Sequence, residues 1–312
     1  MVARGPLGPR ALRARSWDVL ARDLLAAHES WNVHSVFRQA LNLVAPDGSL
    51  LGVVRIDDAE RWGNGPAVLV LEDGPHRVPF DVEVEPGTAA RIQCGVLTIA
   101  DRLAVDLAPA ALWSPPAIHL TLPLDEIAAR IVAARGRAGA LAPNEGFAPL
   151  LSDAASGPPD LTLLRASALI DNLSTAIRAR RWAAVAAPAR ALSGLGPGLT
   201  PSGDDVLAGL ALGIRAGLGS LPEPLAAALH AAVEGRTTDL AVARVRHAVA
   251  GRPDEAVHRL LTALVDGPPD HLAGAVRAVI EYGHSSGADT LVGIDRGLRL
   301  GVALLHEGGA AT

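Results

Sequence analysis

The sequence predicts an α+β protein in which a β-rich amino-terminal domain is followed by an all-helical domain. Short apolar runs with many β-branched residues, separated by turn residues, fill residues 50–122. From residue 161 onward, apolar residues recur at helical spacing. Between these regions, residues 136–160 are rich in Gly and Pro and lack sustained periodicity. We therefore expect two domains, residues 1–150 and 151–312, and the chain is long enough for two cores.

The amino-terminal domain is expected to form an antiparallel sheet or a small barrel. A helix over residues 18–27 and a helical stretch between Ser35 and Asn42 precede the sheet, and a helix over residues 124–134 follows it. Residues 82–85 alternate between apolar and acidic side chains, which is typical of a half-exposed strand. The predicted strands are residues 51–56, 67–71, 78–84, 91–99 and 117–122.

The carboxyl-terminal domain is expected to be a bundle of helices of ordinary length. Pro and Gly separate the periodic segments, most clearly at residues 222, 251–253 and 267–269. The predicted helices are residues 161–180, 205–218, 224–233, 239–250, 254–265, 271–282 and 289–305.

The composition excludes several classes of protein. A formal net charge of −5 carries no basic excess, which argues against a nucleic-acid partner. The single cysteine, Cys94, allows neither an internal disulfide nor a cysteine cluster for a metal. All 28 basic residues are Arg, and this excludes a P-loop lysine, a lysine Schiff base and a lysine general base. Residues 1–17 lack the apolar segment of a secretory signal, and no apolar run is long enough for a membrane span, so we expect a cytoplasmic protein without a membrane partner.

A repeat organises the helical domain. Residues 202–217 and 286–301 share the pattern Ser-Gly-x-Asp-x-Leu-x-Gly at an offset of 84 residues, and eight of the 16 aligned positions are identical. Each copy predicts a helix start with a capping box. Ser202 and Ser286 would be the N-caps, and Asp205 and Asp289 would reach back to them.

Each predicted helix then carries a stripe of glycines at every fourth position. A glycine inside a helix costs about 1 kcal/mol relative to alanine. Close approach of another backbone would offset this cost, so we predict that both helices are central and tightly packed. That the two helices pack directly on each other is a hypothesis. The stripes are Gly209, Gly213 and Gly217 in the first copy and Gly293, Gly297 and Gly301 in the second.

The segment before the first copy favours a ligand site. Residues 194–201 read Gly-Leu-Gly-Pro-Gly-Leu-Thr-Pro, and Gly196 and Gly198 permit a ligand to approach the backbone closely. The first-turn N–H groups, at Gly203 and Asp204, favour an anion such as a phosphate or carboxylate. Two adjacent carboxylates would repel that anion unless Mg²⁺ or a substrate amine or amide lies between them. Capping alone also explains the Ser and Asp of both copies, and it is the favoured interpretation of them.

Two further segments hold candidate site residues. Residues 235–239 open a predicted helix, where Thr237 follows Arg236; simple capping and an anion contact through Arg236 are equally favoured. His284 and Ser285 lie beside the second predicted cap. The Gly-x-Ser-x-Gly pattern of residues 283–287 is not interpreted as an esterase motif, because a helix rather than a strand precedes it. The glycines of residues 194–198 likewise have the wrong spacing for a dinucleotide site.

The segment 194–209, with its Gly-Leu-Gly-Pro-Gly-Leu-Thr-Pro-Ser-Gly-Asp-Asp run, resembles the hallmark of a bacterial family. That family, long of unknown function, includes the AllH-type subunit of oxamate carbamoyltransferase from anaerobic allantoin degradation, a branch of purine catabolism. Residues 236–238 and 283–289 are similar to its other signature segments. The resemblance implies a subunit that acts with other subunits to exchange carbamoyl groups between carbamoyl phosphate and oxamate. The chain lacks the Ser-Thr-Arg-Thr-Arg motif of ordinary transcarbamoylases.

We therefore expect a subunit of a carbamoyltransferase-like complex that acts without a covalent enzyme intermediate. Thr200, Asp204 and His284 would orient the amide or move protons. Backbone N–H groups at Gly203 and Asp204 would stabilise developing negative charge, and Arg236 would neutralise the phosphate. The expected substrate-binding residues are Gly196, Gly198, Ser202, Gly203, Asp205, Arg236, Thr237, Ser285, Ser286 and Asp289.

Two alternatives remain open at this point. In the first, the same pocket binds a small anion in a non-catalytic binding or assembly protein, and a partner chain performs the chemistry. In the second, the chain is a Mg²⁺-dependent hydrolase with Asp204, Asp205 and Asp289 as metal ligands. Outside that alternative no cofactor or metal is predicted.

Overall fold

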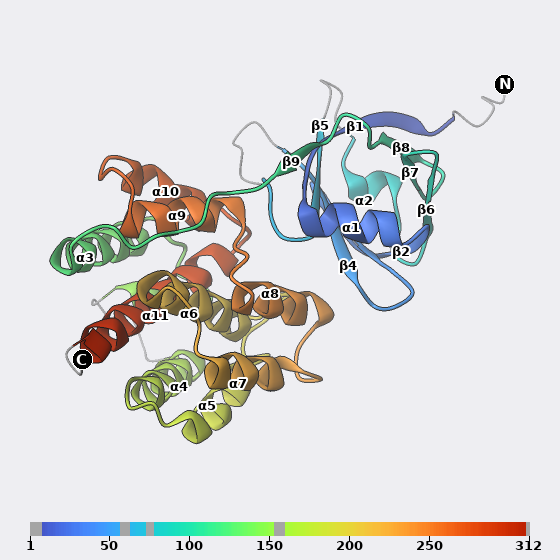
Figure 1. Cartoon of the computed structure of the whole chain (residues 1–312). Coiled ribbons are helices and arrows are strands. Elements are labelled where there is room, and N and C mark those ends of the chain that lie inside the picture. Colours follow the sequence, from blue (N-terminus) through green and yellow to red (C-terminus); the bar gives the residue numbers. More distant parts are fainter. Residues whose placement is uncertain (1–7, 57–62, 73–77, 153–159, 310–312) are drawn as a thin grey trace. The chain divides into compact units, whose positions relative to one another are not determined.

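The computed structural model describes residues 8–56, 63–72, 78–152 and 160–309. It divides the chain into two compact units, residues 1–116 and 117–312 (Figure 1). The first is a β-barrel and the second is helical, which confirms the predicted fold class. The division predicted near residue 150 falls inside the second unit. The helix α3 (Leu124–Leu141) precedes that position, yet its Ile127 and Ile131 belong to the helical core.

The barrel closes because its first strand has partners on both sides. The strand order is β5-β4-β3-β2-β6-β7-β8-β1-β9, and β1 also pairs with β5, so β1 to β8 form a ring and β9 continues along β1 beyond β8. The β4–β5, β1–β8 and β1–β9 pairs are parallel and the others are antiparallel. The strands are β1 (Arg10–Asp18), β2 (Ser30–Val36), β3 (Ala40–Val44), β4 (Leu50–Arg55), β5 (Val68–Glu72), β6 (Ala89–Gln93), β7 (Val96–Ile99), β8 (Leu103–Asp106) and β9 (Ala111–Trp113).

Alternating burial along the strands builds the barrel core. In β1 every second residue from Leu12 to Asp18 is buried, as expected for a strand with one face toward a core. Trp31 and Phe80 are the largest apolar side chains in this core. The helix α1 (Val19–Ala27) begins where predicted, because the Asp18 carboxylate accepts from the N–H of Ala21 and caps it.

Several sequence predictions for this unit were wrong. Residues 78–84 contain the short helix α2 (Phe80–Glu83) instead of a strand, because Phe80 enters the core while Val82 is 72% exposed. Residues 82–85 are therefore no half-exposed strand. The stretch between Ser35 and Asn42 is the β2–β3 hairpin instead of a helix, and these two residues pair across it. Residues 91–99 form two strands, because Cys94 and Gly95 take positive φ angles and make a hairpin.

The predicted strand at residues 117–122 is also absent. This segment belongs to the helical unit, where the N–H groups of Thr121 and Leu122 both donate to the carbonyl of Val265. It therefore has no strand neighbour to pair with. The strands predicted at residues 51–56 and 67–71 are present as β4 and β5.

The helical unit surrounds a central pair, α6 and α11, with the α3–α9–α10 group on one side and the α4–α5–α7 group on the other (Figure 1). The seven helices predicted after residue 160 are all present; the short α5 was missed. No described helix is both long and apolar enough to cross a membrane. The remaining helices are α4 (Leu161–Arg178), α5 (Ala186–Leu192), α6 (Ser202–Leu218), α7 (Glu223–Val233), α8 (Asp239–Val249), α9 (Glu255–Val265), α10 (His271–Ile280) and α11 (Ser286–Gly309), with 3₁₀ turns η1 (Ala148–Leu151) and η2 (Trp182–Ala184).

The two glycine stripes bring α6 and α11 into direct backbone contact, as hypothesised. Every residue of α6 except Arg215 and Leu218 is buried, which is typical of a central helix. A methyl group added at Gly213 would lie 2.7 Å from the carbonyl oxygen of Ile294. One added at Gly301 would lie 2.6 Å from the carbonyl oxygen of Ile214. The glycines of each helix therefore make room for the backbone of the other.

Candidate functional site

The starts of α6 and α11 meet within the helical unit. The hydroxyl oxygen of Thr200, two residues before α6, lies 2.9 Å from that of Ser286, the first residue of α11. Thr200 is half-buried and follows the exposed residues Gly198 and Leu199. The contact thus joins the two sequence motifs at a position next to an exposed loop.

The capping box predicted for α6 does not form. The N-cap of α6 is Pro201, no side chain caps this helix, and Ser202 is its first residue. The Ser of each copy lies instead beside the Asp of the other copy: Ser286 beside Asp205, and Ser202 beside Asp289. The glycine stripes explain this exchange, because they bring the neighbouring helix close enough for its side chains to reach.

The first-turn N–H groups of α6 are already used inside the protein. The N–H of Gly203 donates to the carbonyl of Leu195, and that of Asp204 donates to the carbonyl of Pro201, both at 2.9 Å. The role predicted for these two groups, stabilising negative charge on a ligand, was therefore wrong. Because both N–H groups donate to preceding carbonyls, neither is free to donate to a ligand.

Asp204 connects three segments by hydrogen bonds: α6, to which it belongs, the loop 194–200 and the segment before α8. It is fully buried, and its Oδ2 accepts from the N–H of Gly194 at 3.0 Å and from the Thr237 hydroxyl at 2.6 Å. The neighbouring Thr238 caps α8 and donates to the carbonyl of Leu199. The loop 194–200 is thus held at Gly194 by Asp204 and at Leu199 by Thr238.

Asp289 likewise connects its helix, α11, to a loop, the one that contains Gly146 and Phe147. Its Oδ1 accepts from the N–H of Phe147 at 2.6 Å, and the side chain is fully buried. Gly146 has a φ of +55°, and a methyl group there would lie 2.7 Å from the carboxylate oxygens of Asp289 and 2.9 Å from the Ser202 hydroxyl. Glycine is therefore required at this position for the loop to cover Asp289.

Asp205 faces Arg244, which the sequence interpretation missed. Nε of Arg244 lies 2.6 Å from Oδ1 of Asp205, and one terminal nitrogen donates to Asp254 at 3.0 Å. The other terminal nitrogen donates to the Thr290 hydroxyl at 3.0 Å, and the guanidinium lies over the Tyr282 ring. Arg244 thus links α6, α8, the start of α9, and α11. Nothing in the spacing of Arg residues on α8 distinguishes it from its exposed neighbour Arg246.

Burial raises the pKa of all three carboxyl groups. Burial raises the pKa of Asp205 to about 7, although the guanidinium of Arg244 opposes this. Burial also raises the pKa of Asp204, against the opposing hydrogen bond from Thr237. It raises the pKa of Asp289, against the hydrogen bond from the N–H of Phe147. Raised carboxyl pKa values in one region are a common property of functional sites, and they also arise in structural networks.

Other predicted site residues lie at the surface. The His284 side chain is 85% exposed and forms an ion pair with Glu145, and Arg236 is exposed. Ser285 is half-buried and lies beside Asp289. Gly196 packs on Ser202, whereas nothing lies near the α-carbon of Gly198 on the side where a methyl would stand. The structure therefore brings together Thr200, Ser202, Asp205, Ser286 and Asp289, with His284 and Arg236 at the periphery.

The described residues give no geometric support for the metal-dependent alternative. No three His, Cys, Asp or Glu side chains among them are placed so that they could hold one metal ion. Asp204, Asp205 and Asp289 instead have separate protein partners.

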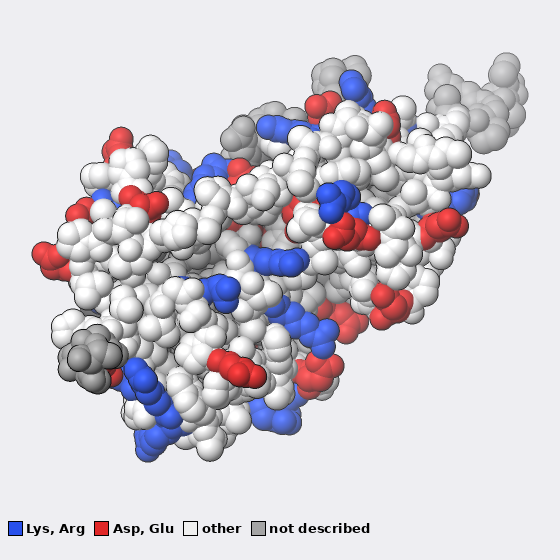
Figure 2. All heavy atoms as spheres, viewed as in Figure 1, with Lys and Arg blue, Asp and Glu red and all other residues white. Residues whose placement is uncertain are grey.

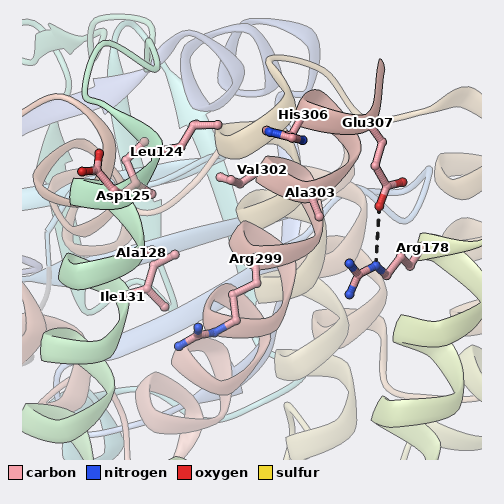
Figure 3. A pocket seen from close by; sticks show the side chains of 11 residues that line it. Leu124, Asp125, Ala128, Ile131, Arg178, Arg299, Val302, Ala303, His306 and Glu307 are labelled. Atoms are coloured by element: carbon pink, nitrogen blue, oxygen red, sulfur yellow. Dashed lines mark ion pairs between the residues drawn. The ribbon is translucent and has the colours of Figure 1, made fainter. Parts of the chain in front are cut away.

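A hollow of about 400 Å³ lies elsewhere in the helical unit, between α3 and the carboxyl-terminal half of α11 (Figure 3). Its polar residues include Arg178, paired with Glu307, and Arg299, paired with Asp295. It contains none of the predicted site residues. Basic and acidic side chains are interspersed on the face of the molecule that Figure 2 shows.

Comparison with known proteins gives one family. Residues 192–298 match the model of the oxamate carbamoyltransferase subunit AllH, and residues 10–112 match that of the AllH family N-terminal domain. Together the matches cover most of the chain, both the barrel and the α6–α11 region. No curated protein and no solved structure matches.

Proposed function

The chain belongs to the AllH family, and from this membership we propose that it is a carbamoyltransferase subunit that binds a small anionic amide where α6 and α11 meet. The family model is that of a subunit of oxamate carbamoyltransferase. Its match begins at residue 192, immediately before the loop 194–200, and ends within α11. The proposed site therefore lies in the part of the chain that carries the family identity.

The observation that carries the proposal is the contact between the hydroxyls of Thr200 and Ser286. Thr200 follows the exposed residues Gly198 and Leu199, and Ser286 lies beside Asp205, which pairs with Arg244. Hydroxyls both donate and accept, so the pair can contact an amide nitrogen and a neighbouring oxygen. His284 and Arg236 at the periphery supply positive charge or hydrogen-bond donors for a carboxylate or phosphate.

In the proposed reaction, the amide nitrogen of oxamate attacks the carbamoyl carbon of carbamoyl phosphate. A nitrogen–carbon bond forms, the bond from the carbamoyl carbon to the phosphate oxygen breaks, phosphate leaves, and the nitrogen loses a proton. Thr200 and Ser286 orient the amide, His284 takes part in proton movement, and Asp204 acts only by holding the loop 194–200 in position. No residue of the chain becomes covalently modified.

Binding measurements on paired variants test this proposal. We expect Thr200→Val and Ser286→Ala each to weaken oxamate binding by about tenfold or more in isothermal titration, since each removes one hydroxyl partner. Thr175→Val and Ser174→Ala are matched controls, because these α4 hydroxyls bond only to carbonyls of their own helix in the described contacts. Unchanged oxamate affinity in the site variants would contradict the proposed location.

A second candidate is a non-catalytic subunit that binds the anion while a partner chain performs the transfer. The observation that favours it is that Asp204, Asp205 and Asp289 are all buried against protein partners. Turnover in the complex reconstituted with its partner subunits separates the two candidates. A lower kcat in the His284→Gln variant at saturating substrate supports catalysis by this chain; an unchanged kcat supports binding alone.

A further inference from the structure

The hollow between α3 and α11 has the size and the lining of a small-molecule site. Its volume of about 400 Å³ falls within the range of about 300–1,000 Å³ that is typical of ligand pockets. Apolar side chains of both helices form most of the lining: Leu124, Ile127, Ala128, Ile131, Val302 and Ala303. Ile127 and Ile131 are buried members of the helical core, so this part of the wall is held by interior packing. The hollow can therefore bury the apolar part of a small molecule.

One end of the hollow carries positive charge. Figure 3 shows the Arg299 side chain extending from α11 toward α3. Its Nε donates to Oδ1 of Asp295 at 3.0 Å, and 40% of the side chain is exposed. Arg135 lies 3.5 Å from the other oxygen of Asp295, so two guanidiniums share one carboxylate and leave a net positive charge. Because a guanidinium has five N–H donors, Arg299 can bind an anion while it stays paired with Asp295.

The other charged residues of the hollow leave this end positive. Arg178 pairs with Glu307 at 3.6 Å, so these two charges offset each other. Asp125 is exposed, and Figure 3 shows its carboxylate directed away from α11. His306 lies about two helical turns beyond Arg299, which is about 10 Å along α11, and it brings no negative charge. A ligand whose anionic group lies at Arg299 can thus extend an apolar chain along the helix.

The sequence repeat supplies an internal comparison for this position. Arg215 of α6 aligns with Arg299 of α11. The loop between α8 and α9 packs directly on Arg215, because a methyl group added at Gly251 would overlap its guanidinium. The protein's own chain therefore covers the first arginine, whereas the second is exposed beside a hollow. Of the two equivalent arginines, only Arg299 is left open to a ligand.

We propose that this hollow binds a small amphipathic carboxylate, with the carboxylate on Arg299 and the hydrocarbon chain against the apolar wall of α3 and α11. A ligand with both parts matches the two features of the lining, the net positive end and the apolar wall. The helix α11 runs without interruption from Ser286 past Arg299, a separation of about 20 Å. A ligand in the hollow would therefore not touch Thr200 or Ser286, and this binding is independent of the proposed substrate site.

Titration of the full chain with octanoate and octanol tests the proposal. We expect saturable octanoate binding in the millimolar range or tighter. The affinity for octanoate should exceed that for octanol by about tenfold or more, since only the carboxylate pairs with Arg299. Methyl NMR locates the ligand, because the resonances of Ile131 and Val302 should shift and those of the barrel should not. Absence of saturable binding, equal affinity for the two probes, or shifts confined to other methyl groups overturns the proposal.

Neighbouring residues supply matched variants for each part of the ligand. Ala128→Leu fills part of the hollow and should weaken octanoate binding by about tenfold or more, whereas Ala129→Leu, beside it on α3 and outside the hollow, should not. Arg299→Met should abolish the preference for octanoate over octanol. Arg296→Met, which removes an ion pair with Asp171 on the same helix outside the hollow, should retain it. Equal effects of the two variants within either pair overturn the proposal.

Two further measurements keep the outcome decisive. Arg299→Met leaves Asp295 paired with Arg135, so it should fold, and the Ala128→Leu pair carries the test where it does not. Octanoate titration of the complex reconstituted with its partner subunits should give the same affinity as the chain alone; loss of binding there shows that a partner covers the hollow and overturns the proposal. Octanoate binding without oxamate binding contradicts the proposed function and supports the site in the hollow.

Discussion

The starts of α6 and α11 carry the same Ser-Gly-x-Asp pattern and are packed in the same way. In both, the glycine at the second position lies against a carbonyl of the preceding helix: Gly203 against Leu192, and Gly287 against Val279. In both, the Asp at the fourth position is fully buried beside the Ser of the other copy. The shared residues are therefore accounted for by packing.

The two copies differ in residues around the helix start, and the contacts that these residues make occur only at the start of α6. Asp204 of the first copy aligns with Ala288 of the second, so only the first start holds a glycine-rich loop and the segment before α8. Thr200 belongs to that loop. The duplicated element thus supplies the common packing, and the proposed site joins one shared residue, Ser286, to Thr200 in the loop that only the first start holds.

The largest expected effect on stability comes from disturbing the packing of α6 against α11. Gly213→Ala places a methyl group 2.7 Å from the backbone of α11, so we expect a loss of about 3 kcal/mol in the free energy of unfolding, or failure to fold. Gly274→Ala is the control, because this α10 glycine has open space around it and should gain about 0.5 kcal/mol. Urea unfolding measures both. Equal stability of the two variants would contradict the direct packing of α6 on α11.

An effect of similar size is expected when Asp205 loses the buried cation of Arg244. Arg244→Met leaves Asp205 buried without its cation and should cost about 3 kcal/mol at pH 8. The cost should be smaller at pH 5, where Asp205 is protonated. Arg246→Met on the same helix removes an exposed ion pair with Glu234 and should cost less than about 1 kcal/mol. Chemical denaturation at both pH values checks this, and a cost for Arg244→Met that does not depend on pH would argue against the pairing.

The third prediction concerns the pH dependence of stability. Burial raises the pKa of Asp205 to about 7, so its protonated form stabilises the native state at low pH, and this contribution is lost as the pH rises through about 7. The stability of the wild type relative to Asp205→Asn should therefore fall by about 3 kcal/mol from pH 4.5 to pH 8. Thermal unfolding of both proteins across this range measures the difference. A constant difference would mean that Asp205 ionises normally.

The smallest effect on stability is expected at Asp204, which aligns with Ala288 of the second copy. Thr237→Val removes one of the two hydrogen bonds to Oδ2 of Asp204 and should cost about 1 kcal/mol. Hydrogen exchange at Gly194, whose N–H is the other partner, should become faster than in the wild type. An unchanged exchange rate would show that Asp204 does not need Thr237 in order to hold the loop.

The helical unit could be predicted better than the barrel. Helical periodicity and Pro or Gly breaks located seven helices, because each signal is local to its segment. In the barrel, residues 35–42 were interpreted as helical although they are a hairpin, since strands of five to seven residues show too few alternations to be recognised. β1 was not predicted at all; two of its four buried residues, Ser16 and Asp18, are polar, and its pairing partners β5 and β8 are distant in sequence.

The sequence predicted several residues of the candidate site but not the contacts between them. The repeat correctly indicated that α6 and α11 are central, because the glycine cost has no other explanation. The capping interpretation was wrong for α6 because it considered this helix alone, whereas Ser202 lies beside Asp289 of the opposite helix. Arg244 could not have been found, since its importance depends on Asp254 and Thr290 reaching it from other helices.

The double pairing of β1 constrains the order in which the amino-terminal unit can form. β1 holds residues 10–18, but its parallel neighbour β8 holds residues 103–106. A chain emerging from the ribosome can therefore join β1 to β5 well before it can close the ring. Until β8 is synthesised, one edge of the first strand stays open to other chains. Barrel closure is thus a late step in the formation of the amino-terminal unit, and slow translation near residue 100 would prolong the period in which nascent chains can aggregate.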